Sequence, residues 1–300
     1  MGIGNYIKEI GRGKDGARAL SRVQAADLLG QILDAQVTDL EVGAFCLAMR
    51  IKGETAEEMA GFLDALHARM TTLANDASQV TVVIPCYNGA RKLPALAPLL
   101  ALLLVQAGVQ VCVHGTPTES GRTTSFDVFS ALGYTPLQDI NAASAGLNLC
   151  PTEALSPALK KLLDVRRVVS LRNPAHSLVK LMNPCKGRAL IVSSYTHPEY
   201  AASMAQTFQL TQANAFLIRG TEGEPVADAR RTPQMDFFHN GIMQTVQAAQ
   251  TGALQSLPDL PDPSAEATAA YIQQVLQRQR VVPAPIALQV QHILQALKSL

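Results

Sequence analysis

The segment Val80–Gly115 restricts the fold of this chain more than any other part of the sequence. It begins with a buried-strand pattern, passes through a turn of composition PCYNG at residues 85–89, and continues into an apolar helical stretch from about Leu96 to Gln106. Short buried strands are predicted at residues 80–84, 110–114, 189–193 and 215–218, with helices between them. Strands that alternate with helices in this way predict a mostly parallel central sheet covered by helices.

A helical pattern precedes this sheet region. Residues 21–70 carry apolar side chains at helical spacing, and Glu54 begins a helix whose first turn is acidic. The expected core faces of two of these helices are Leu28, Leu29, Ile32 and Leu33, and Val42, Phe45, Leu47, Ala48 and Ile51. A chain of 300 residues, 48% of them hydrophobic, is long enough for two unequal domains. We therefore expect an α/β protein with a small all-helical domain at residues 1–74 and a larger α/β domain at residues 78–300, in which helices near 156–188 pack back toward the helical domain.

Several motifs in these segments resemble the glycosyltransferase family 3 fold, and anthranilate phosphoribosyltransferase in particular. The MRIKGET segment at residues 49–55 resembles the hinge of the family's helical domain, and AGVQVCVHG at residues 107–115 resembles a strand that ends in the family's His-Gly pair. The resemblance implies a fold like that of nucleoside phosphorylases and phosphoribosyltransferases. It also implies a homodimer that forms through the N-terminal helices.

The residues that hold phosphate and magnesium in that family are largely replaced. The family's Gly-Thr-Gly-Gly-Asp motif falls on Pro85–Gly89, its Asn-x-Ser-Thr motif on Ala95–Pro98, its lysine on Val113 and its metal-binding carboxylates on Pro225 and Val226. Glu222 and Glu224 lie nearby and are interpreted as solvated loop residues, although magnesium asks for only one or two carboxylates. Loss of a single charge-stabilising donor typically costs an enzyme roughly 2.7 to 4 kcal/mol. We expect no catalytic residue, no metal and no cofactor, with Mg²⁺ needed only if a transferase activity has survived.

Basic residues are concentrated between Ser156 and Arg188, where eight lysines and arginines stand against one acid, Asp164, in a chain of net charge +1. Such a block predicts an anion-binding face, and a solvated helix surface is the simpler alternative. Because Val165–Pro184 aligns with the family segment beside the cleft, we favour the first interpretation. The candidate anion-binding or nucleic-acid-binding residues are Arg91, Lys92, Lys160, Lys161, Arg166, Arg167, Arg172, His176 and Lys180. The residual cleft is expected to contain Tyr87, Asn88, Gly89, His114, Gly115 and His197.

Four short segments refine the resemblance. The sequences PCYNGARK, RNPAHSLVKL, SSYTHPEY and RGTEGEP look like the YbiB-type branch of anthranilate phosphoribosyltransferase-like proteins. That resemblance implies a homodimer that keeps the fold, lacks the tryptophan-pathway activity and binds nucleic acid. Lysine and arginine contacts to phosphate would make such binding salt-dependent and largely independent of sequence. Stacking of bases on Tyr87, Tyr134, Tyr195 and Tyr200 would favour single strands over duplex.

Two other functions stay open. A transferase or phosphorylase that acts on an unidentified nucleoside or sugar phosphate would use His114, Arg166 and His176 on the base side, with Arg91 and Lys92 on phosphate. The second alternative is an ordinary anthranilate phosphoribosyltransferase. We expect a cytoplasmic protein with no membrane partner, because the N-terminal residues lack a signal-peptide pattern and no long uninterrupted apolar run occurs. Of the five scattered cysteines, Cys86 in the turn is the candidate reactive thiol.

Overall fold

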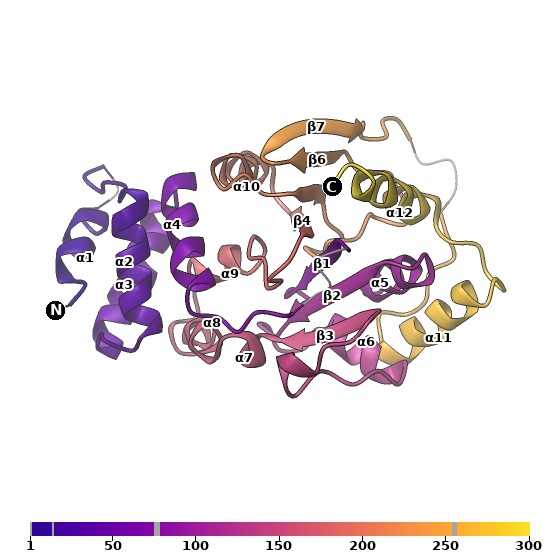
Figure 1. The fold of residues 1–300 in the computed structure, drawn as a ribbon, viewed down its shortest axis with the longest axis horizontal. Coiled ribbons are helices and arrows are strands. Elements are labelled where there is room, and N and C mark those ends of the chain that lie inside the picture. The colour runs from indigo at the N-terminus through magenta and orange to yellow at the C-terminus, as the bar shows by residue number, and fades with distance from the viewer. Residues whose placement is uncertain (1, 14, 75–78, 254–256) are drawn as a thin grey trace.

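The structure is a computed structural model that describes residues 2–13, 15–74, 79–253 and 257–300. Its first four helices are α1 (Gly4–Ile10), α2 (Arg22–Leu33), α3 (Asp39–Lys52) and α4 (Ala56–His67), which form a separate bundle at the left of Figure 1. Ser21, Thr38 and Thr55 each begin a helix with a capping box, closed by Gln24, Glu41 and Glu58 respectively. The expected domain boundary falls at residues 75–78, which lie outside the described residues.

The buried side of α3 differs from the prediction. Phe45 is buried as expected, but its buried neighbours in α3 are Cys46 and Met49. The prediction that Leu47 and Ile51 lie in the core is wrong, because these residues are 47% and 60% exposed. Helical spacing defines a stripe of apolar residues, but it does not say which flank of that stripe the other helices cover.

The central sheet contains β1 (Thr81–Cys86), β2 (Gln110–Gly115), β3 (Leu147–Pro151), β4 (Ala189–Tyr195), β5 (Ala215–Arg219), β6 (Met235–His239) and β7 (Ile242–Gln247). Its strand order is β3-β2-β1-β4-β5-β6-β7. Pairings from β3 through β5 are parallel, whereas β6 and β7 add antiparallel strands at one edge. The prediction of a mostly parallel sheet with a helical domain before it is confirmed.

Helices cover both faces of this sheet (Figure 1). They are α5 (Ala97–Gln106), α6 (Ser125–Ala131), α7 (Thr152–Leu155), α8 (Pro157–Val169), α9 (Ala175–Leu178), α10 (Pro198–Leu210), α11 (Ala265–Leu276) and α12 (Ala284–Leu297). Side chains alternate along each strand, so Val82 of β1 joins a core with α5, α6, α11 and α12, while Val83 joins a core shared with α8, α9, α10 and the N-terminal helices. None of the described helices combines the length and apolar character that crossing a bilayer requires.

Parallel pairing brings the loops that follow β1, β2, β4 and β5 to the same edge of the sheet. These loops contain residues 87–92, 116–124, 196–197 and 220–227. On the helical side, α8 and α9 pack against α2 and α4, and the backbone N–H of Asn183 donates to His67 Nε2 at 3.1 Å. The candidate site is therefore assembled from four loops and from the junction between the helical bundle and the sheet.

Candidate functional site

The turn that follows β1, residues 87–92, is closed by a buried carboxylate. Glu224 is 2% exposed, and its Oε1 accepts the backbone N–H groups of Asn88 at 2.6 Å and Gly89 at 2.9 Å. Its other oxygen accepts the Ser125 hydroxyl at 3.3 Å. Backbone N–H groups of such a turn are the donors that phosphate sites between a strand and a helix use. Here the Glu224 side chain accepts the hydrogen bonds of these N–H groups.

Glu222 closes the second half of the β1 turn. Its carboxylate accepts the backbone N–H of Lys92 at 2.9 Å and also that of Arg91. The side chains of Arg91 and Lys92 remain exposed. The interpretation of Glu222 and Glu224 as solvated loop residues is therefore wrong, because both carboxylates pair with turn amides far away in sequence.

The loop that carries these glutamates depends on a glycine. Gly223 has a φ of +90°, and a Cβ at this position would lie 1.9 Å from Asn88 Nδ2. That amide nitrogen donates to the Gly223 carbonyl at 2.7 Å. Lys180 Nζ donates to the same carbonyl at 3.0 Å. Burial lowers the pKa of Lys180 to about 8, and the Glu224 charge opposes this shift. Lys180, predicted as an anion ligand, thus also holds the loop in place.

The carboxylates of Glu222 and Glu224 do not fit a magnesium site. The oxygens that a metal would use already accept backbone hydrogen bonds. Among the described residues, no group of three or more His, Cys, Asp or Glu side chains is arranged to hold a metal ion.

His114 and Gly115 lie behind the turn and serve packing. The Tyr87 hydroxyl is 2.8 Å from His114 Nδ1 and 2.9 Å from Thr152 Oγ1. Burial lowers the pKa of His114 to about 3 and raises the pKa of Tyr87. A Cβ at Gly115 would lie 2.0 Å from the Cys86 carbonyl oxygen, so only glycine fits.

Two expectations about exposure in this region are wrong. Tyr87 is 4% exposed and therefore cannot stack on a base. Cys86 is buried as well, and burial raises the pKa of its thiol, which disfavours the reactive thiolate. Of the other tyrosines expected to stack, Tyr195 is half-buried, whereas Tyr134 and Tyr200 are exposed.

Three arginines converge on Glu119 in the loop after β2, and we call Arg122, Arg166 and Arg172 the arginine cluster. Arg166 Nη1 lies 2.9 Å from Glu119 Oε1, Arg122 Nη2 lies 2.8 Å from Oε2, and Arg172 also donates to Oε1. Although burial opposes the shift, the hydrogen bonds from Arg172 and Arg166 lower the pKa of Glu119 to about 2. Arg166 and Arg172, predicted as anion ligands, therefore already share an internal carboxylate.

The remaining basic candidates lie along α8. Lys160 and Arg167 both pair with Asp164, and the Arg167 contact is 3.1 Å long with 67% of its side chain exposed. Lys161 is exposed between them. This helix therefore presents more positive than negative charge to solvent.

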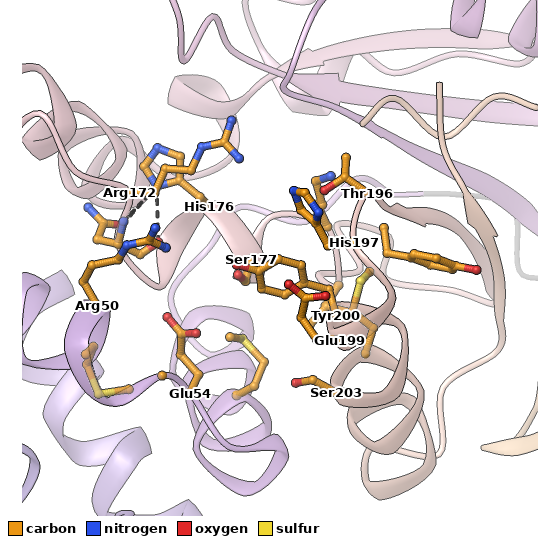
Figure 2. A pocket seen from close by; sticks show the side chains of 18 of the residues that line it. Arg50, Glu54, Arg172, His176, Ser177, Thr196, His197, Glu199, Tyr200 and Ser203 are labelled. Atoms are coloured by element: carbon orange, nitrogen blue, oxygen red, sulfur yellow. Dashed lines mark hydrogen bonds between the residues drawn. The ribbon is translucent and has the colours of Figure 1, made fainter. Parts of the chain in front are cut away.

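A cavity of about 410 Å³ lies between the helical bundle and the α/β domain, beside the places where the two are in contact. The end of α3, the segment from Arg172 to Leu181, and the β4–α10 region line it. Figure 2 shows Arg172 and His176 on one side of this interdomain cavity, with Glu54 and Arg50 from the helical domain and His197, Glu199 and Tyr200 from the start of α10.

Burial, assisted by Arg172, lowers the pKa of His176 to about 4. Its Nε2 is buried and has no hydrogen-bond partner within the described residues. The sequence had not indicated Arg50, Glu54 or Glu119 as site residues.

Similarity to known proteins agrees with this geometry. The helical bundle domain of a glycosyl transferase family matches residues 5–70. An uncharacterized protein, YbiB of Escherichia coli, is 39% identical over 297 residues, which cover 96% of this chain and 92% of that protein. The chain belongs to the YbiB-type branch of the glycosyltransferase family 3 fold. An anthranilate phosphoribosyltransferase of a Nocardioides species is 28% identical, with 79% of this chain and 73% of that protein covered.

Solved structures support the same fold for this YbiB-type chain. Anthranilate phosphoribosyltransferase from Thermus thermophilus superimposes with a TM-score of 0.78 at 20% identity, over 98% of this chain and 89% of that one. The enzyme from Saccharomyces cerevisiae in complex with PRPP and Mg gives a TM-score of 0.70 at 14% identity, over 98% of this chain and 88% of that one. At these identities the likeness concerns the fold. In this YbiB-type chain, Glu222 and Glu224 close the β1 turn.

Proposed function

We propose that this protein binds nucleic acid on a phosphoribosyltransferase scaffold and does not transfer phosphoribosyl groups. The observation that carries the proposal is the closure of the β1 turn by Glu222 and Glu224. A pyrophosphate leaving group would have to displace both carboxylates and would meet their negative charge. Since catalysis of this kind consists of positioning and charge stabilisation, the turn opposes the reaction in both respects.

Basic side chains near the interdomain cavity support the choice of nucleic acid. Arg172 and Lys180 line the cavity, and Lys161 and Arg167 extend the positive charge along α8. Phosphate contacts of this type supply most of sequence-independent affinity for nucleic acid. Exposed Tyr200 beside the cavity offers a ring for an unpaired base, which favours single strands.

The exposed side of α3 supports a homodimer. Leu40, Leu47 and Ile51 recur along one side of this helix and are 83%, 47% and 60% exposed. Apart from its own helix backbone and chain neighbours, no atom of the described residues lies within 4 Å of a Cβ built at Gly43 between them. Apolar patches of this kind mark protein contacts, and a second copy would double the nucleic-acid footprint. Replacing Leu47 and Ile51 by lysine should give a monomer in light scattering, and a dimer that survives both changes would contradict this assignment.

The test of nucleic-acid binding is fluorescence anisotropy with a short labelled oligothymidylate, repeated across a salt series. We expect the logarithm of affinity to fall linearly with the logarithm of salt concentration. Charge reversal of Lys161 and Arg167 should weaken binding about tenfold and leave the melting temperature nearly unchanged, because both side chains are exposed. The matched control reverses Arg278 and Lys298, which are exposed just beyond the C-terminal ends of α11 and α12. No binding at low salt, or equal loss in the control, contradicts the proposal.

A pentosyl transferase acting on an unidentified substrate is the second candidate, and one observation favours it. The interdomain cavity of about 410 Å³, with the unpartnered His176 Nε2 in its wall, is large enough for a small ligand. For anthranilate as the acceptor, the assay incubates the protein with PRPP, anthranilate and Mg²⁺ and follows phosphoribosyl anthranilate. Magnesium-dependent product above background would establish the transferase.

We propose that the protein is located in the cytoplasm, where nucleic acid is available and its five free cysteines stay reduced.

A further inference from the structure

The arginine cluster holds more charge than its internal partner can neutralise. Three guanidinium groups surround the single Glu119 carboxylate. Isolated ion pairs of this chain, such as Arg22 with Asp64 and Arg69 with Asp34, match one positive charge with one negative charge. Two positive charges are therefore left over at this point, next to the interdomain cavity that Arg172 lines.

The cluster can be reached from solvent. The Glu119 side chain is 17% exposed, whereas those of Arg172 and Arg166 are 43% and 24% exposed. Glu119 lies in the loop at residues 116–124, between β2 and α6, outside any regular helix or strand. Its carboxylate can leave the guanidinium groups by rotation of its own side chain, while α8 keeps Arg166 in place.

A phosphodiester matches the carboxylate that it would replace. Both groups carry one negative charge, and both offer two equivalent oxygens to the planar N–H donors of arginine. Arginines that meet a carboxylate within one chain are thus suited to the phosphates of a nucleic-acid backbone.

We infer that Arg122, Arg166 and Arg172 form a phosphodiester site, and that Glu119 occupies this site until a backbone phosphate displaces it. The inference rests on the proposed function and adds the location of one phosphate contact and its internal competitor. Free protein is protected from small anions because Glu119 is always present at the site. A polymer gains the further contacts along α8 that offset the cost of moving Glu119 aside.

A structural role for the cluster leads to a different expectation. If Glu119 only fastened its loop to α8, its loss would leave three like charges close together and would lower stability without raising affinity for any anion. If Glu119 competes with phosphate, its loss also strengthens nucleic-acid binding. Affinity therefore separates the two roles, and stability does not.

The experiment compares Glu119→Gln with Glu153→Gln in the full chain, using the labelled oligothymidylate at fixed low salt. Both changes remove one negative charge, but Glu153 is exposed on α7, outside the cluster. We expect Glu119→Gln to bind about tenfold more tightly than the unaltered protein and Glu153→Gln to change affinity by about twofold at most. Glu119→Ala should act in the same direction, and adding Arg172→Ala to Glu119→Gln should reverse most of the gain.

Each outcome decides the inference. Equal affinities for the two glutamine variants, or weaker binding by Glu119→Gln with an unchanged melting curve, would overturn it while the proposed function stands. Binding that is absent in every variant would overturn both. Binding by Glu119→Gln alone would support the site and show that the free protein keeps it closed. If Glu119→Gln does not fold, the same comparison is made with Glu119→Ala.

Discussion

The β1 turn and the arginine cluster both set protein carboxylates against groups suited to phosphate, but they differ in balance and burial. In the turn, Glu224 is buried and shares one oxygen between two backbone amides, so donors and acceptors are matched. In the cluster, one half-buried Glu119 serves three arginines at the edge of a cavity. The first arrangement stabilises the fold and excludes anions, whereas the second leaves positive charge available to a ligand. The two regions therefore lead to different expectations for stability and for anion binding.

The largest effect is expected from Glu224→Ala. This change leaves the N–H groups of Asn88 and Gly89 unpaired inside the protein and removes the negative charge near buried Lys180. We expect a loss of roughly 3 kcal/mol in the free energy of unfolding, measured by urea denaturation. Inorganic phosphate should restore part of this loss in the variant by binding the freed amides, and should leave the unaltered protein unchanged. Equal stabilisation of both proteins by phosphate would mean that Glu224 does not keep phosphate from the backbone amides of the β1 turn.

The pH dependence of stability tests whether the buried region around His114, next to the β1 turn, excludes water. Burial lowers the pKa of His114 from its ordinary 6.5 to about 3, so the folded protein keeps this ring neutral while the unfolded chain takes up a proton below pH 6.5. Stability is then complete above pH 6.5 and falls with decreasing pH, by about 1.4 kcal/mol per pH unit from this group. His176 contributes in the same direction down to about pH 4.

The check is the slope of unfolding free energy between pH 6.5 and pH 5 in the unaltered protein and in His114→Gln. The variant should lose roughly 2 kcal/mol less over this interval. Glu119 does not interfere, because its lowered pKa affects stability only as the pH falls below the ordinary glutamate range. Parallel slopes in the two proteins would mean that His114 is charged in the folded state, and so that the region behind the turn admits water.

The sequence predicted the fold more completely than it predicted these contacts. Periodicity and the acidic first turn after Glu54 predicted α2, α3 and α4 but not α1, and β-branched runs predicted β1, β2, β4 and β5. The hairpin of β6 and β7 was missed although Asn240-Gly241 is a strong turn signal, and both residues have positive φ. β3 was missed because LNLCP is short and ends in proline.

The candidate site was harder to predict because its contacts join distant segments. Loss of the family's phosphate and metal ligands could be read residue by residue. The hydrogen bond from the Asn88 backbone to Glu224 could not, since the two residues are 136 positions apart and only the strand order brings their loops together. Arg166 and Arg172 were found from charge alone, but their shared partner Glu119 lies in a loop with no pattern of its own.

Glu222→Ala should have an intermediate effect. Its carboxylate accepts the amides of Arg91 and Lys92 at the exposed end of the turn, where water can replace it. We expect a loss of about 1 kcal/mol, well below that of Glu224→Ala, in the same urea measurement. A loss as large as that of Glu224→Ala would show that the hydrogen bonds of both glutamates stabilise the whole turn. No loss would show that only the hydrogen bonds of Asn88 and Gly89 to Glu224 stabilise it.

The smallest effect on stability is expected in the arginine cluster, from Arg172→Ala. Arg122 and Arg166 continue to hold Glu119 in this variant, and removing one of three like charges relieves their repulsion. We expect the free energy of unfolding to change by no more than about 0.5 kcal/mol, because exposed ion pairs contribute little. Oligonucleotide affinity should nevertheless fall, since Arg172 lines the cavity. A loss of stability near that of Glu224→Ala would mean that the cluster, like the turn, is part of the folded framework, and the contrast between the two regions would then fail.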